Sequence, residues 1–75
     1  MPTAIVLIVG DEILQGHTQD TNSHYLAGRL RARGIELRRI VTVSDEVDEI
    51  TLQLERLIAD APDFIFVCGG TVGEV

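Results

Sequence analysis

Cysteine is almost missing from this sequence, and long apolar runs are missing altogether. The single cysteine, Cys68, excludes an internal disulfide and a cysteine-rich zinc site. No apolar run approaches the roughly 18–20 residues that a membrane-spanning helix needs. The first residues carry no basic, apolar signal segment and lead straight into a strand pattern. The sequence therefore predicts a cytoplasmic protein that does not contact a membrane.

Lysine is absent too, so the six basic residues are all arginine, against twelve acidic residues. The net charge of −6 and the pI near 4.6 argue against a nucleic-acid partner. Residues 1–43 hold five arginines and four acids, whereas residues 44–75 hold one arginine and eight acids. We therefore expect a phosphate-bearing ligand to meet the first half of the chain, or backbone amides. The five arginines between 29 and 39 are most simply a solvated face, with a subunit or phosphate contact as the alternative.

Several common catalytic and binding motifs are also absent. His17 and His24 have no cysteine or carboxylate at ligand spacing, which argues against zinc. No serine, histidine and aspartate combine into a nucleophilic triad. The glycine-rich segments match neither the Walker loop nor the dinucleotide-binding fingerprint.

What the sequence does contain is three apolar stretches separated by two helical patterns. The continuous run Ala4–Val9 is typical of a parallel strand covered on both faces, and residues 63–68 form a second stretch of this buried type. Residues 35–43 alternate between apolar and polar, with Arg38 and Arg39 in the middle, and predict a more exposed strand.

Each helical pattern has recognisable ends. The first begins at Thr21 or Asn22 as N-cap, and Gly34 stands where a left-handed residue ends a helix. The second has Ser44 or Asp45 as N-cap and ends before Pro62. Its apolar stripe consists of Val47, Ile50, Leu54, Leu57 and Ile58.

The resulting order of strand, helix, strand, helix, strand predicts an α/β fold with a parallel sheet, since crossovers of this kind are right-handed. If the first strand is central, the chain reverses direction across the sheet beside it. Ligands of such sheets bind at this reversal, beyond the carboxyl ends of the strands. Seventy-five residues with two helices leave a sheet edge and a sheet face uncovered, so we expect residues 1–75 to be the amino-terminal part of a larger, associating domain.

Two loops leave these carboxyl ends. The loop at residues 10–22 is longer than the roughly 2–6 residues that such connections need, and it is rich in acidic and hydrogen-bonding groups. Asp11 and Glu12 can bind a ribose, a pterin amide edge or, through water, Mg²⁺, although a solvated turn explains them equally. The second loop, Gly69-Gly70-Thr71, offers backbone amides to a phosphate or a flat ring, and its simpler reading is a tight turn.

The run Gly-Asp-Glu-Ile-Leu-Gln-Gly-His-Thr-Gln-Asp-Thr-Asn, with Val43-Ser44-Asp45 and Gly69-Gly70-Thr71, resembles the molybdopterin-binding domain family, whose members include MoaB and Mog proteins. Within it, the branches of competence/damage-inducible protein A and of the FAD synthases are the most similar. The resemblance implies a three-layer α/β/α domain, roughly twice this length, that binds molybdopterin or a nucleotide through phosphates. Carried over by position, the ligand site consists of Gly10, Asp11, Glu12, Asp20, Asn22, Asp45, Gly69, Gly70 and Thr71.

The resemblance also assigns roles. Asp45 matches a functional aspartate of the adenylyltransferase branch, so it is the candidate catalytic residue, and Asp11 and Asp45 are the candidate ligands of Mg²⁺. The chain departs from the family where Val72 replaces an expected glycine and no acidic segment follows.

Three functions stay open at this point. The chain is a binding domain without chemistry, a metal-dependent enzyme, or an inactive fragment. The enzyme is either a pyrophosphatase acting on ADP-ribose or FAD, or a molybdopterin adenylyltransferase. A homo-oligomer is expected in each case.

Overall fold

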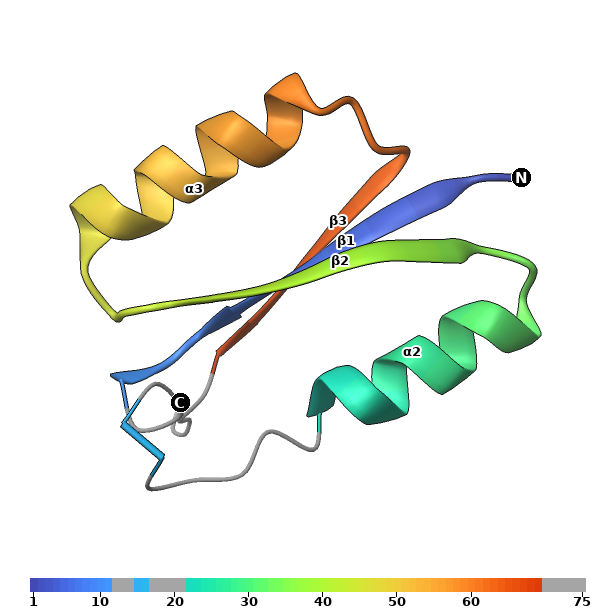
Figure 1. The fold of residues 1–75 in the computed structure, drawn as a ribbon, viewed down its shortest axis with the longest axis horizontal. Helices are drawn as coiled ribbons and strands as arrows, with labels where there is room; N and C mark the ends of the chain where they lie inside the picture. The colour runs from blue at the N-terminus through green and yellow to red at the C-terminus, as the bar shows by residue number, and fades with distance from the viewer. Residues whose placement is uncertain (12–14, 17–21, 70–75) are drawn as a thin grey trace.

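The computed structural model describes residues 1–11, 15–16 and 22–69, and for Asn22 the backbone alone. Strand β1 (Thr3–Val9) is followed by helix α2 (Asn22–Ala32), strand β2 (Glu36–Val43), helix α3 (Val47–Ala59) and strand β3 (Phe64–Gly69). The strands form one parallel sheet in the order β2-β1-β3. The sheet lies between α2 and α3, one on each face (Figure 1). The predicted α/β fold and the central position of the first strand are confirmed. No helix in these ranges is long and apolar enough to cross a membrane.

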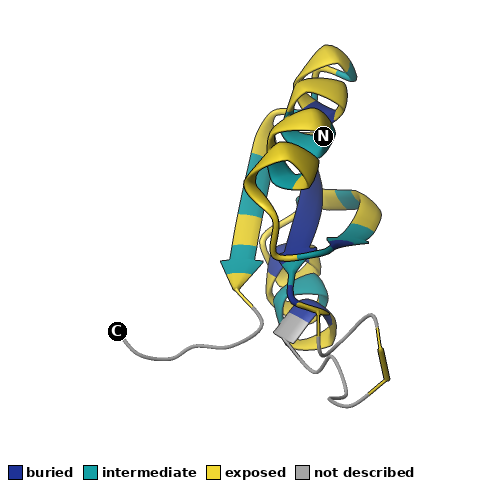
Figure 2. Cartoon of the chain, turned by 90° about the vertical axis from the view of Figure 1, so that its left-hand side faces the viewer, coloured by how far each residue is buried: buried dark blue, intermediate teal, exposed yellow. Residues whose placement is uncertain are grey.

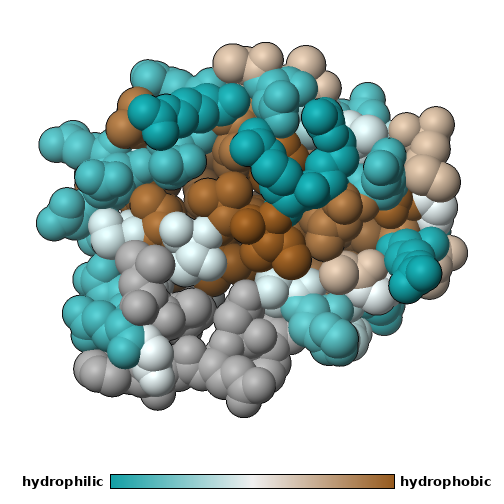
Figure 3. Space-filling model, in the orientation of Figure 1, coloured by the Kyte–Doolittle hydropathy of each residue, from teal (hydrophilic) through white to brown (hydrophobic). Residues whose placement is uncertain are grey.

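The core forms around β1, because this strand has a neighbour on each side and a helix on each face. Ala4 to Ile8 are at most 1% exposed, and the buried colour is concentrated on this middle strand (Figure 2). Ile5 and Leu7 pack with Leu57 of α3. Val6 and Ile8 point to the opposite face, towards α2, because side chains alternate along a strand. Apolar residues form a band between the two helices in the space-filling view (Figure 3).

Helix α3 presents only part of its apolar stripe to this core. Ile50, Leu54 and Leu57 face the sheet, whereas Val47 and Ile58 are 77% and 64% exposed. The expectation that Ser44 or Asp45 caps this helix is wrong, because Glu46 occupies the N-cap and its side chain makes no capping hydrogen bond. At the other helix, the predicted end is confirmed. Gly34 is left-handed with φ +76°, and Ile35 N–H donates to Leu30 O at 2.9 Å.

Strand β2 contains a shift in its pairing with β1 that the alternating sequence does not predict. Ala4 pairs with Leu37 and Ile5 pairs with Arg39, so Arg38 is an extra residue with no partner on β1. Leu37 therefore shares a face with Ala4, on the α2 side, whereas Val41 and Val43 share the α3 face with Leu7 and Val9. A bulge thus lets one run of alternating residues serve both faces of the sheet.

Strand β3 is an exposed edge, not the buried strand that its composition predicts. Phe64 is 45% exposed and Val67 is 54% exposed. Cys68, expected in the core, is half-buried. The reason is that β3 pairs with β1 alone, so its other side has no strand partner among the described residues, which agrees with the expected uncovered sheet edge. The amino end of β3 is held by Asp63, whose carboxylate accepts a hydrogen bond from Thr3 N–H at 2.7 Å.

Candidate functional site

All three strands end at the same level. Val9 pairs with Val43 on one side and with Gly69 on the other, so residues after these three positions leave the sheet together (Figure 1). We call this edge, formed by Gly10, Asp11, Ser44, Asp45 and Gly69, the rim. Asp11 and Gly69 are 58 positions apart in the sequence and lie at the same end of the sheet. The predicted convergence of the two loops on one end of the sheet therefore holds for the residues that begin them.

Gly10 extends the pairing of β1 with β2 beyond the strands. Its N–H donates to Val43 O at 3.0 Å, and the residue is buried. This bond fixes the direction in which the chain leaves β1. It also brings the start of the first loop against the connection between β2 and α3.

Asp11 joins the two connections directly. Its Oδ1 accepts a hydrogen bond from Asp45 N–H at 3.1 Å. Its backbone carbonyl accepts Gln15 N–H at 2.9 Å, and Gly16, next to Gln15, has φ +79°. A left-handed backbone is costly for residues other than glycine, which explains Gly16 in the motif. Sequence reasoning missed both Gln15 and Gly16 as structural residues of this loop.

Asp45 presents its carboxylate to solvent at the rim. The residue is exposed, and its side chain makes no hydrogen bond or ion pair with any part of the chain that the structure describes. Among the described residues, Asp11 engages the amide of Asp45 and not its carboxylate.

Gly69 ends β3 at the rim with open space beside it. A Cβ placed on this residue would meet no described atom within 4 Å. A ligand can therefore approach the main chain there. The other predicted site residues, Glu12, Asp20, Gly70 and Thr71, lie outside the described residues, as does the side chain of Asn22.

The rim is acidic, because Asp11 and Asp45 are both exposed, and the exposed Glu46 follows it directly. A phosphate group meets unfavourable charge here unless a cation or backbone amides offset it. Hard carboxylate oxygens suit Mg²⁺, which commonly binds through one or two carboxylates, several waters and the phosphates of its ligand. Asp11 and Asp45 fit this pattern, although Asp11 Oδ1 is already engaged. No cluster of three or more potential metal-binding side chains exists among residues 1–11, 15–16 and 22–69.

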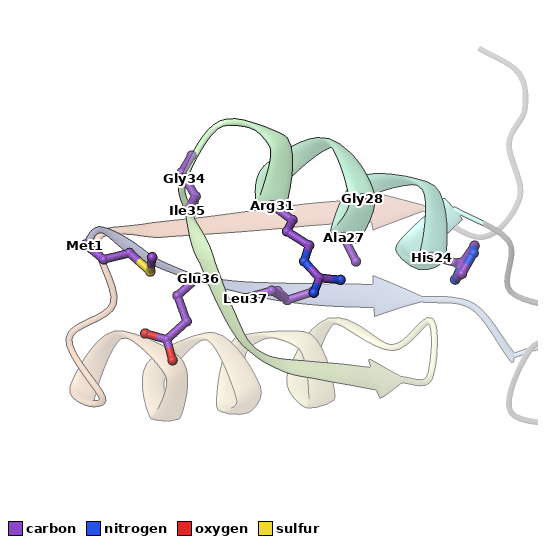
Figure 4. Close-up of a pocket in the computed structure, with 9 residues that line it drawn as sticks. All are labelled: Met1, His24, Ala27, Gly28, Arg31, Gly34, Ile35, Glu36 and Leu37. Carbon is purple, nitrogen blue, oxygen red and sulfur yellow. The ribbon is translucent and has the colours of Figure 1, made fainter.

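The arginines lie away from the rim and are partly paired within the chain. Arg39 donates to Asp60 Oδ2 at 2.8 Å, and Arg38 is 3.8 Å from the same atom. Arg29 donates to Tyr25 Oη at 3.2 Å. These contacts agree with the expectation of a solvated arginine face. A separate hollow of about 560 Å³ lies between α2 and β2 and includes Arg31 and His24, but no rim residue lines it (Figure 4).

Comparison with known proteins points to one family. A family described as "Probable molybdopterin binding domain" matches residues 5–73. A protein named "Probable FAD synthase" from Caenorhabditis briggsae is 41% identical over 68 residues, which are 91% of this chain and 13% of that protein. A protein of Thermococcus kodakarensis is 43% identical over 67 residues, 89% of this chain and 27% of that protein.

The fold has a similar counterpart among solved structures. The crystal structure of the protein CinA, of unknown function, from Thermoplasma acidophilum matches with a TM-score of 0.79 and 34% identity. The match covers 87% of this chain and 38% of that one. The chain thus spans well under half the length of these relatives.

Proposed function

Because the chain belongs to the molybdopterin-binding domain family, we propose that its rim binds a pterin or a nucleotide through the ligand's phosphate groups. The observation that carries this proposal is the hydrogen bond from Asp45 N–H to Asp11 Oδ1, at the level where all three strands end. It unites the start of the long first loop with the residue that the family resemblance marks as functional. The open main chain at Gly69 supplies the third side of the same edge.

A divalent cation belongs to this proposal on electrostatic grounds. The rim carries exposed carboxylates and, among its described residues, no arginine, so a phosphate needs a counter-charge. Asp45 is the residue that would hold Mg²⁺, with Asp11 as the second candidate from the family resemblance, and the ion would neutralise the phosphate oxygens. We therefore expect ligand binding to depend on Mg²⁺.

The second candidate is an enzyme that cleaves or forms a phosphoanhydride, with Asp45 as the catalytic residue. A relative named a probable FAD synthase favours a nucleotide over a pterin as the reacting molecule. Hydrolysis of ADP-ribose or FAD and adenylyl transfer to molybdopterin all place a diphosphate or a phosphate at the rim. The chain spans only 13% of that relative, so the enzyme activity of residues 1–75 is itself a proposal.

Calorimetry with ADP-ribose and with FAD, each with Mg²⁺ and with EDTA, tests the binding function. We expect saturable binding of one ligand that EDTA abolishes and Asp45→Asn weakens. Glu36→Gln is the matched control, because it removes an exposed charge at the opposite end of the sheet. Chromatography of the same mixtures separates the alternatives: a product that forms with wild type and not with Asp45→Asn supports the enzyme. Binding of neither nucleotide by the wild-type chain would leave the pterin as the ligand, and failure to bind molybdopterin as well would favour an inactive fragment.

A further inference from the structure

The two acidic residues of the rim have different surroundings. Asp11 places one carboxylate oxygen on a backbone amide 34 positions away, whereas the Asp45 carboxylate makes no hydrogen bond or ion pair with the residues that the structure describes. One oxygen of Asp11 is therefore already used inside the chain.

Within the described ranges, few other hydrogen bonds hold the connection between β2 and α3. Glu46 takes the N-cap position of α3, with φ −123° and ψ 135°, but makes no side-chain capping bond. The Gly10 N–H bond to Val43 O, 3.0 Å, fixes the end of β2. Beyond it, the contact from Asp11 to the Asp45 amide is the hydrogen bond that fixes the direction of the chain before the helix starts.

We infer that Asp11 is a positioning residue: its carboxylate holds the backbone of Asp45, and it acts on a phosphate-bearing ligand through Asp45. This inference rests on the proposed function, and it replaces direct metal binding as the role of Asp11. A positioning role needs only a hydrogen-bond acceptor at Oδ1, which asparagine also supplies. A metal-binding role needs the negative charge, which asparagine lacks.

The substitutions Asp11→Asn and Asp11→Ala separate the two roles. With ADP-ribose or FAD and Mg²⁺, we expect Asp11→Asn to keep Kd within about twofold of wild type. Asp11→Ala should raise Kd about three- to tenfold, the range expected for one lost hydrogen bond. An equal loss in both variants would overturn the inference, since charge and not the acceptor would then matter.

A double-mutant cycle adds a second readout. Asp45→Ala removes the carboxylate and keeps the backbone amide. If Asp11 acts through Asp45, Asp11→Ala should change Kd by less than about twofold in that background. A full three- to tenfold effect there would show that Asp11 contacts the ligand or its cation by itself.

Amide hydrogen exchange tests the contact without any ligand. Exchange at Asp45 N–H should accelerate in Asp11→Ala and stay near the wild-type rate in Asp11→Asn, while exchange at Val41 in β2 serves as the folding control. Unchanged exchange in folded Asp11→Ala would overturn the inference. If Asp11→Ala does not fold, the comparison of Asp11→Asn with wild type still decides between charge and acceptor. Failure of the wild-type chain to bind ADP-ribose, FAD or molybdopterin would refute the proposed function, whereas the exchange rates of Asp45 N–H would still decide whether Asp11 positions Asp45.

Discussion

The two helices end in the same backbone conformation with different residues, and this provides a direct test of the fold. After α2, Gly34 has φ +76°, and after α3, Ala61 has φ +56°. Ala61 N–H donates to Ile58 O at 3.0 Å, so the alanine is held in the left-handed region as part of the helix end. We therefore expect Ala61→Gly to stabilise the chain and Gly34→Ala to destabilise it.

The size of both effects follows from the backbone alone. A left-handed conformation costs a residue with a Cβ about 1–2 kcal/mol. Glycine recovers this cost but loses about 0.4–1 kcal/mol through the greater freedom of its unfolded state. The net change in the free energy of unfolding is about 0.5–1 kcal/mol, an increase for Ala61→Gly and a decrease for Gly34→Ala. A Cβ at Gly34 would meet nothing within 4 Å, so no steric contribution confuses the comparison.

Urea unfolding followed by circular dichroism measures both changes, with an unchanged slope confirming that only stability differs. In a chain of this size, 1 kcal/mol corresponds to about 4–8 °C in Tm. Ala59→Gly is the matched control, because the same substitution within the helix should destabilise by up to about 1 kcal/mol. A lower midpoint for Ala61→Gly, or a higher one for Gly34→Ala, would refute the assigned helix ends.

Three further predictions concern the core, the sheet edge and the surface. Leu57→Ala should lower the free energy of unfolding by about 2–5 kcal/mol, because Leu57 is 1% exposed. Ile58→Ala, at a position that is 64% exposed, should change the same free energy by about 0.5 kcal/mol or less. If the chain associates through β3, Val67→Lys should weaken association in sedimentation and Val47→Lys should not, and a monomeric wild type would contradict this. Arg39→Ala should lower the free energy of unfolding by less than about 1 kcal/mol, because the ion pair of Arg39 with Asp60 is exposed. The difference in this free energy between wild type and variant should become smaller in high salt.

The sequence predicted the order of elements because its signals were local. The continuous apolar run of β1, the stripe of α3 and the position of Gly34 each depend on a few neighbouring residues. The parallel sheet followed from the handedness of the crossovers, and the central position of β1, which the sequence analysis took as a condition, is found in the structure. The exposure of β3 could not be predicted in the same way. Its apolar composition is typical of a strand with neighbours on both sides, whereas β3 pairs with β1 alone and leaves Phe64 45% and Val67 54% exposed.

The candidate site was predicted in outline and not in detail. Adjacent acidic residues after β1, and an aspartate after β2, pointed to one end of the sheet, and Asp11 and Asp45 do meet there. Sequence could not show that the contact joins a carboxylate to a backbone amide, because backbone amides are not distinguished by residue type. The N-cap of α3 was predicted from side-chain preference at Ser44 or Asp45, but the backbone places Glu46 there.

The geometry of the rim depends on the bulge at Arg38, at the far end of β2. Beyond the bulge, Ile5 pairs with Arg39 and the register continues unchanged to Val9 and Val43. Without the extra residue, either Leu37 would leave the α2 face or the carboxyl end of β2 would slip by one residue, about 3.3 Å. Such a slip exceeds the length of the 3.1 Å bond from Asp45 N–H to Asp11 and would break it. Val43 packs in the α3 core, which fixes the carboxyl end of β2, whereas Leu37 lies on the α2 face and lines the hollow there. The bulge allows Leu37 to lie on the α2 face and Val43 on the α3 face at the same time. It thereby sets the position of Asp45 opposite Asp11.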